Sequence, residues 1–303
     1  MPRIIAQFAL TTCCTLLFMS CFAKSIQAEE TVPLPIGFME YTFSDISIED
    51  TKVAIDFYLQ KLLRGTGNKP KAVIFSHLGE LRQSLQKKEI DMASLSSIDF
   101  LRLEPDSVLT PILVRIQTNG KLFDTYVLLV NKKTQWSTLT DLKNTSLRIQ
   151  NSDDLGSYWL HVELAKAQLP KAMKFFNSVA QDRRPAQSIL SVFFGQSDAC
   201  LVNTTTFETM SKLNPQIAQQ LVPIMTSPPF ISGFLCAHSQ MPAPRKKIIQ
   251  DTTLNLSKSD DGYQVIRLFN TQDLLLFQTD HLATVVDLFN QYKKYYGTTD
   301  IQY

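Results

Sequence analysis

The chain has 303 residues, of which 44% are hydrophobic, and this length can bury more than one ordinary core, so two lobes are expected. Its formal net charge is +2. The near-neutral charge and the lack of a Lys/Arg run argue against binding to nucleic acid or to an anionic membrane surface.

The first residues have the pattern of a secretory signal. After Arg3 comes an apolar run, residues 4–23, and then a polar stretch that ends in Ala28. A basic start, a short apolar region and a small residue at the cut are typical of a cleaved signal peptide. We therefore expect residues 1–28 to be removed, by cleavage after Ala28, and the protein to reside in the periplasm. Two alternatives stay open: a membrane anchor, because about 20 apolar residues can span a bilayer, and a lipoprotein anchored at Cys21.

Three of the five cysteines lie in this segment, which leaves Cys200 and Cys236. Both stand in strand-like runs, DACLV and FLCAH, where Cys often serves as a small buried hydrophobe. We therefore expect two buried thiols. A disulfide is the alternative, because an oxidising compartment permits one.

The first third of the chain alternates between strand and helix patterns. Strands are expected at residues 33–39, 72–75 and 90–95, and helices at residues 49–63, 78–88 and 98–104. Ser96 and Ser97 stand directly before the last of these helices, in the position of an N-cap. The alternation indicates parallel α/β units.

The same alternation continues in the rest of the chain, where the strand at residues 125–130 is expected to cross from one lobe to the other. Strands are expected at residues 109–117, 125–130, 147–149, 174–176, 198–202 and 234–237, and helices at residues 138–143, 157–168 and 187–194. The strand at residues 125–130 is apolar throughout, as a strand buried on both faces is. From Pro242 to Tyr303 the segment is expected to be helical, at residues 243–257, 262–268 and 281–296.

These elements predict an α/β fold with two lobes, each a mainly parallel sheet with flanking helices. Residues 29–127 together with residues 233–303 form the first lobe, and residues 128–232 form the second lobe, inserted into the first. Two crossings between lobes make a hinge, and a ligand is expected in the cleft between them.

Four runs carry a resemblance to a known family. In chain order they are LRQSLQKKEIDMASLSSIDFL, NGKLFDTYVLLVNKKTQWSTLTDLKNTSLRI, RRPAQSILSVFFGQSDACLV and LVPIMTSPPFISGFLCAHS. With them, the chain resembles the phosphonate-type periplasmic substrate-binding proteins of ABC transporters, within the type 2 periplasmic-binding fold. The resemblance covers most of residues 32–290. It implies a monomer that binds a small molecule and presents it to a transporter permease.

The chain departs from this family at expected ligand positions. The family's binding turn reads roughly Ser-x-Ser-Gly, and Asp154-Leu155-Gly156-Ser157 occupies it here. His161 stands where the family has a proline. Arg183 and Arg184 stand in another divergent loop, where they either bind an acidic group or remain solvated. These departures make simple phosphate or phosphonate a less obvious ligand than the family name suggests. The expected ligand is a small polar molecule that is phosphonate-like, oxyanionic or zwitterionic.

The divergent turn supplies three candidate ligand-binding residues: Asp154, Gly156 and Ser157. Gly156 and Ser157 offer a close-approach residue, a hydroxyl and exposed amides at a helix N-terminus, which attracts an anion. Asp153 and Asp154 precede them. Either they cap the helix and interact with its positive end, or Asp154 meets an amino group of the ligand.

The other candidates lie near strand ends, because α/β binding sites form at the carboxyl edge of a sheet. They are Tyr41, Ser76, His77, Ser96, Ser97, Thr125 and Asn203. Hydroxyl and amide groups can donate and accept hydrogen bonds, and Tyr41 with Phe43 could form an aromatic wall. Structural alternatives exist for each: the serines as helix caps, His77 as a structural group and Tyr41 as part of a packed surface loop.

Signatures of catalysis are absent from the sequence. It has no Gly-x-Ser-x-Gly, no phosphate-binding loop, no His-Glu-x-x-His and no paired-Cys metal spacing. We therefore expect no enzyme activity, no cofactor and no metal. The main hypothesis is a periplasmic solute-binding protein for an ABC transporter. The alternative is a periplasmic sensory or accessory module of the same fold that reports the ligand to a membrane sensor.

Overall fold

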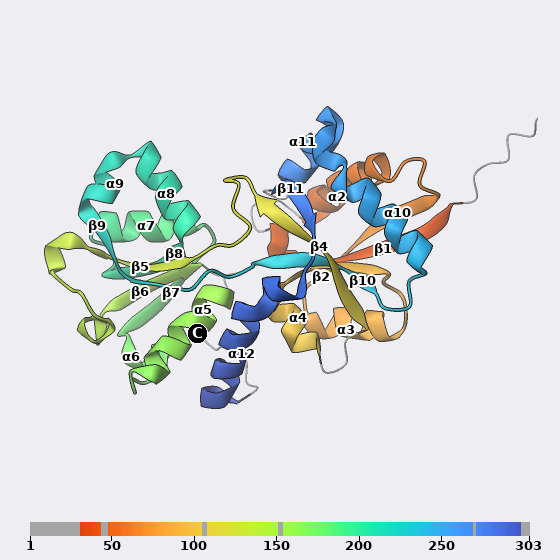
Figure 1. Cartoon of the computed structure of the whole chain (residues 1–303). Coiled ribbons are helices and arrows are strands. Elements are labelled where there is room, and N and C mark those ends of the chain that lie inside the picture. Colours follow the sequence, from red (N-terminus) through yellow and green to blue (C-terminus); the bar gives the residue numbers. More distant parts are fainter. Residues whose placement is uncertain (1–30, 44–47, 105–107, 151–153, 269–270, 298–303) are drawn as a thin grey trace, which may run out of the picture. The chain divides into compact units, whose positions relative to one another are not determined.

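The computed structural model describes residues 31–43, 48–104, 108–150, 154–268 and 271–297 (Figure 1). Within these residues the strands form two sheets, one of six strands in the order β11-β4-β10-β3-β1-β2 and one of five in the order β7-β6-β8-β5-β9. Residues 33–303 make one compact unit. The expected signal-peptide cleavage after Ala28 and the alternative lipid anchor at Cys21 concern residues outside the described ranges.

The first sheet is built from strands that are far apart in sequence. They are β1 (Val32–Met39), β2 (Asn68–Phe75), β3 (Met92–Ser96), β4 (Leu109–Gln117), β10 (Gly233–His238) and β11 (Thr271–Leu276). Helices α3 (Leu78–Gln86) and α4 (Ser97–Leu103) cover one face, and α2 (Ile48–Leu62), α10 (Ala243–Leu254) and α11 (Asp260–Leu268) cover the other (Figure 1). Strand residues alternate between these faces, as a pleated strand requires.

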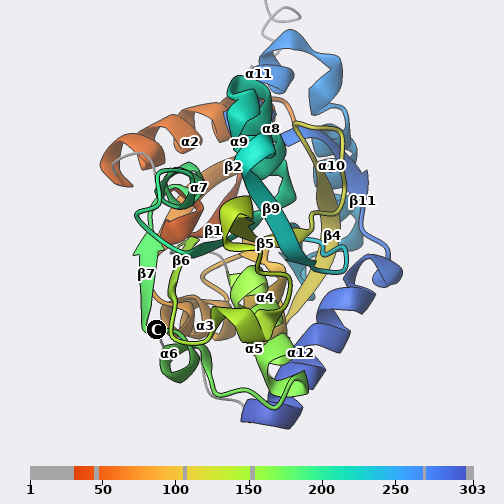
Figure 2. The same cartoon turned by 90° about the vertical axis from the view of Figure 1, so that its left-hand side faces the viewer.

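The second sheet comes from one continuous part of the chain. Its strands are β5 (Tyr126–Asn131), β6 (Ser146–Gln150), β7 (Ser178–Asp182), β8 (Ala199–Asn203) and β9 (Leu221–Thr226). Helices α7 (Pro185–Phe193), α8 (Thr204–Leu213) and α9 (Pro215–Gln220) lie on one face, and α5 (Asp154–Lys166) and α6 (Ala172–Phe175) lie on the other (Figure 2).

Two segments connect the sheets, and they pair with each other. Asp124 in the outgoing segment and Phe230 in the returning one exchange main-chain hydrogen bonds of 2.9 and 2.8 Å. The last helix, α12 (Ala283–Tyr296), packs against α5. The rings of Tyr158 and Tyr292 lie 4.3 Å apart there, and the Tyr296 hydroxyl donates to the His161 carbonyl at 2.9 Å. The expected connection of the two sheets by crossing segments is therefore present.

The two-sheet α/β class is confirmed, but both sheets are mixed rather than mainly parallel. Strands β1 and β3 are parallel, and β6 is parallel to β7 and β8. Strand β10 is antiparallel to β3 and β4, and β5 is antiparallel to β8 and β9. The antiparallel strands β5 and β10 each follow a crossing segment and enter a sheet from the other sheet, so no crossover helix sets their direction.

Two local predictions are wrong. The strand expected at residues 174–176 is the end of α6, because the adjacent Phe175 and Phe176 are both buried and give no alternation that separates strand from helix. The C-terminal segment is not wholly helical, because β11 pairs with β4 there. The two buried thiols are confirmed: Cys200 and Cys236 are free, and burial raises the pKa of both. No helix among the described residues has the length and apolar character to cross a membrane.

Candidate functional site

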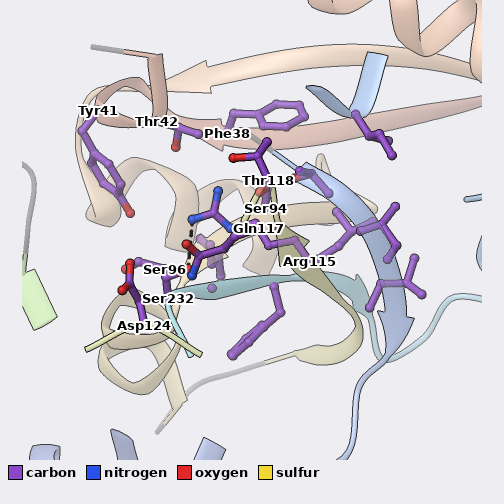
Figure 3. A pocket seen from close by; sticks show the side chains of 18 of the residues that line it. Phe38, Tyr41, Thr42, Ser94, Ser96, Arg115, Gln117, Thr118, Asp124 and Ser232 are labelled. Carbon is purple, nitrogen blue, oxygen red and sulfur yellow. Dashed lines mark hydrogen bonds between the residues drawn. The ribbon is translucent and has the colours of Figure 1, made fainter. Parts of the chain in front are cut away.

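A cavity of about 690 Å³ opens at the carboxyl ends of β1, β3 and β4 in the first sheet (Figure 3). Both sheets and both connecting segments contribute to its lining. The polar lining residues include Tyr41, Ser94, Ser96, Arg115, Gln117, Asp124, Gln150, Arg183, Asn203, Thr205 and Ser232. A volume of this size is within the range of roughly 300–1,000 Å³ that small-molecule sites have.

Arg115 is the cation set most deeply in this cavity. It lies in β4 and projects from the same sheet face as Leu113 and Gln117, two positions away on either side. Its Nη2 donates to the Ser232 hydroxyl at 2.9 Å (Figure 3). Burial lowers the pKa of the guanidinium, and the nearby Tyr126 and Asp124 raise it by less. Arginine nevertheless stays protonated in proteins, so the cavity holds a permanent positive charge.

Asp124 places a carboxyl group in the same lining. Its Oδ1 accepts from the Thr125 main-chain N–H at 3.0 Å and from the Thr205 hydroxyl at 3.2 Å. Burial raises the pKa of Asp124, while these hydrogen bonds and the charge of Lys121 lower it by less. The carboxyl therefore offers an acceptor for an N–H or O–H group of a ligand, and its protonation would reduce repulsion toward an anion.

Three of the predicted residues, Tyr41, Ser96 and Asn203, line the cavity. The Tyr41 hydroxyl donates to Asp99 and is thereby fixed in place. Ser96 is the N-cap of α4, as predicted, and its side chain accepts from the Asp99 N–H at 3.0 Å. Asn203 caps α8 in the same way, with Oδ1 accepting from the Thr206 N–H at 2.7 Å. Capping uses acceptor atoms, so the Ser96 hydroxyl hydrogen and the Asn203 amide group remain chemically able to donate.

A family model for ABC-transporter phosphonate periplasmic substrate-binding proteins matches residues 43–281. The chain belongs to this family. It is a periplasmic substrate-binding protein of the ABC-transporter type, and its family is one of binding proteins rather than enzymes. A comparison with curated protein sequences gives no match.

Solved structures of low sequence identity share the fold. A Xanthomonas citri protein bound to ATP has a TM-score of 0.68 at 12% identity, over 88% of this chain and 99% of that chain. A binding-protein component of an ABC phosphonate transporter from Pseudomonas aeruginosa gives 0.63 at 15%, over 87% of each chain. PhnD1 from Prochlorococcus marinus in complex with methylphosphonate gives 0.62 at 16%, over 86% and 98%. The type 2 periplasmic-binding fold is thus confirmed.

Four other predicted residues, Ser76, His77, Ser97 and Thr125, are not part of the cavity lining. Ser76 donates to Glu40 at 2.6 Å, and His77 is exposed beside it at the start of α3. The buried Ser97 hydroxyl donates to the Ile231 carbonyl of the returning segment. Thr125 and Thr204 share a hydroxyl hydrogen bond of 2.6 Å. Their binding of a ligand stays a prediction.

The divergent turn before α5 is described only in part. Gly156 packs so closely on Tyr126 that a Cβ at this position would come within 2.8 Å of the ring, which explains the glycine by packing. Ser157 is buried, and its carbonyl lies 2.9 Å from Nδ1 of His161. Burial lowers the pKa of His161. Asp153 and the side chain of Asp154 lie outside the described residues, so the capping and amine-binding interpretations both stay open.

Sequence reasoning missed Arg115, Asp124 and Ser232. Arg115 is the lone charged residue in a mostly apolar strand, LTPILVRIQ. Arginine is seldom buried in such a strand unless it is paired, so this pattern could have identified it as a candidate binding residue. Asp124 and Ser232 lie in the connecting segments. Their proximity to Arg115 follows from the pairing of those segments, which no local pattern indicates.

Proposed function

We propose that the chain captures a small molecule bearing an oxyanion in this cavity and presents it to an ABC-transporter permease. The observation that carries the proposal is the Arg115 guanidinium in a lining that also contains Ser94, Ser96 and Ser232. A guanidinium binds phosphonate, sulfonate or carboxylate oxygens through strong, charge-assisted hydrogen bonds. Surrounding hydroxyl groups can complete the coordination of such oxygens.

The second sheet would bind the other side of the same ligand. Asn203 and Thr205 stand at the end of β8 and the start of α8 and line the cavity with Arg115. A ligand that contacts groups from both sheets stabilises the arrangement in which both contacts form. The permease would recognise this ligand-bound arrangement, which is how binding would be coupled to transport.

The mature protein in this proposal begins after Ala28 and acts as a soluble monomer in the periplasm without catalysis. The sequence of residues 1–28 and the family support export. A sensory or accessory role uses the same ligand-induced change. Deleting the partner permease separates the two roles, because uptake of the ligand stops only if the protein serves transport.

Calorimetric titration tests the binding site directly. The protein, purified from the periplasm and refolded to remove carried-over ligand, is titrated with methylphosphonate, methanesulfonate, phosphate and acetate. At least one of these anions should bind, and Arg115→Met should weaken it by about a hundredfold, because loss of a buried charge partner costs ~2–5 kcal/mol.

Arg148→Met is the matched control, because Arg148 is bound to Asp182 and is not part of the cavity lining. It should retain the affinity of the parent at a temperature where the variant is folded. Binding that survives Arg115→Met unchanged would contradict the proposal, and so would a panel in which none of the anions binds.

A further inference from the structure

The cavity continues beyond Arg115 along the face of the first sheet that carries α2 and α10. Residues of β1, β3, β4 and β10 line it, and in β3 and β4 the lining changes from polar to apolar along the strand. From mouth to base, β3 contributes Ser96, Ser94 and Met92, and β4 contributes Gln117, Arg115 and Leu113. In β10, which lies between them, Leu235 is paired with Ser94 and Leu113. Leu113 is therefore level with Ser94, and Arg115 stands two residues nearer the mouth, above the apolar residues Leu113 and Met92.

Helices α2, α10 and α11 and the segments next to them close the base from the side opposite the sheet. The apolar residues of this wall are Leu59, Leu63, Ile249, Leu256 and Ile266, while Leu274 of β11 lies in the sheet itself, paired with Arg115. Ile249 is 2% exposed and Ile266 is 4% exposed. Thr252 and Thr253 of α10 also line this part, and Thr253 donates its hydroxyl to the Ile249 carbonyl at 2.6 Å. This wall is therefore almost wholly apolar, and a water molecule there would find few of the two to four polar partners that it needs.

The volume also exceeds what a compact oxyanion requires. A molecule of five non-hydrogen atoms, such as methylphosphonate, fills roughly 150 Å³ if each atom takes the roughly 30 Å³ of a water in the liquid. The cavity holds about 690 Å³. Such a ligand would leave most of this volume to water, and the part of it against the apolar wall is poorly hydrated and favours an apolar occupant.

We propose that the physiological ligand is amphiphilic: an oxyanion bound at Arg115 that carries an unbranched apolar chain of about five carbons or more, lodged between the first sheet and α10. Arg115 and Leu113 are two residues apart on β4, which is about 7 Å at ~3.3 Å per residue. About five carbon–carbon bonds of ~1.5 Å span that distance. The inference rests on the proposed function, because it extends the ligand bound at the same Arg115.

A chain-length series tests the inference on the parent protein. Methyl-, propyl-, butyl- and hexylphosphonate are titrated into the refolded protein in the calorimeter. Affinity should rise roughly three- to fourfold for each methylene that becomes buried, and by about a hundredfold or more from methyl to hexyl. An affinity that stays flat or falls with chain length would overturn the inference.

Variants at the apolar base locate the chain. Ile249→Phe and Thr252→Phe add bulk to the wall, and each should reduce the ratio of hexylphosphonate to methylphosphonate affinity at least tenfold. Thr252 is only half-buried, so its variant keeps the test available if Ile249→Phe does not fold. Ile189→Phe is the matched control, because Ile189 is equally buried, in the core of the second sheet and outside the cavity lining. A ratio that neither base variant changes would overturn the inference.

The Arg115→Met variant separates the two proposals. If methylphosphonate and hexylphosphonate bind the parent equally well and the variant binds neither, the anion site stands and the apolar extension is refuted. If no phosphonate of any length binds the parent, the apolar extension is refuted, and if methanesulfonate, phosphate and acetate also fail to bind, the anion site is refuted as well. If hexylphosphonate binds more tightly than methylphosphonate and both are lost in the variant, both proposals are supported.

Discussion

Arg115 and Arg148 are two strand arginines in very different surroundings. Arg148 of β6 forms a two-point ion pair with Asp182 of β7, and its Nε lies 2.7 Å from Oδ2. Ser188 of α7 donates to the same carboxylate at 2.7 Å. This pairing raises the pKa of Arg148 and lowers that of Asp182. The pKa of Arg115 is instead lowered, because burial outweighs the effects of Tyr126 and Asp124.

The difference separates a structural charge from a binding charge. Arg148 ties two neighbouring strands together, and its carboxylate partner already satisfies the guanidinium. Arg115 contributes a charge to a cavity, and burial is the largest influence on its pKa there. An oxyanion that enters the cavity would meet this charge in a partly dehydrated setting, where charge-assisted hydrogen bonds are strong.

Replacing each arginine by methionine tests most directly whether the two side chains contribute differently to stability. Arg148→Met should lower the free energy of unfolding by about 3 kcal/mol, because it leaves Asp182 without its cation. Arg115→Met should lower the ligand-free stability by less, because burial of the Arg115 charge offsets part of what its hydrogen bond to Ser232 contributes. Urea unfolding of both variants without ligand measures the difference. Equal losses at the two positions would show that Arg115 is also a structural ion-pair partner.

The pH dependence of stability distinguishes the aspartate beside each arginine, Asp182 near Arg148 and Asp124 near Arg115. Asp182 has a lowered folded pKa, so its contribution is present above the unfolded value of about 3.9 and is lost as the pH falls through the folded pKa. Asp124 has a raised folded pKa, so its contribution is present below about 3.9 and is lost as the pH rises through the folded pKa.

Urea unfolding between pH 3 and pH 7 measures both contributions. Asp182→Asn should remove part of the acid-induced loss of stability, whereas Asp124→Asn should remove a loss that appears on raising the pH. If the pH dependence of stability changes in the same direction in the two variants, the pKa of Asp124 is not raised in the folded protein.

Replacing the two helix-capping residues that line the cavity, Ser96 and Asn203, should have a smaller effect on stability. Ser96→Ala and Asn203→Ala should each reduce the free energy of unfolding by about 1 kcal/mol through loss of the cap. Glycine at either position should cost only a few tenths of a kcal/mol. Thermal unfolding measures the stability, and titration measures the affinity. A glycine variant that keeps its stability but loses affinity identifies a ligand contact in addition to the cap.

Ser232→Ala should have the smallest effect. The change removes one hydrogen bond to Arg115, which is worth about 0.5–1.5 kcal/mol, so affinity for the anion should fall a few-fold to tenfold. Stability without ligand should change little, because Ser232 is only half-buried. Ser239→Ala, at an exposed position, is the control. An affinity equal to that of the parent would indicate that Ser232 does not orient the guanidinium in the bound state.

Local patterns predicted many individual elements. Strand β4 occupies residues 109–117 as predicted, and the cap at Ser96 follows from a serine placed directly before an apolar helix. Local patterns failed at Phe175 and Phe176, where two adjacent buried rings are compatible with either structure. They also left residues 204–226 unassigned, where α8, α9 and β9 lie.

The candidate site was harder to predict because its residues come together through distant pairings. Tyr41, Ser96 and Asn203 follow a general rule about strand ends and do line the cavity. The position of Arg115 depends on β10, which brings Ser232 next to it from 117 residues away. The apolar base depends on which residues of α10 and α11 face the sheet, and no motif in the sequence specifies that.

The central position of β10 has a consequence for how the protein folds. The second sheet is complete once residue 226 has been synthesised, but the first sheet lacks the strand between β3 and β4 until residue 238 is available. Such non-local pairing folds slowly, and the unpaired edges of β3 and β4 stay open to other chains meanwhile. During export the second sheet can therefore form first, while the half of the protein that holds Arg115 is the part that most needs protection from aggregation.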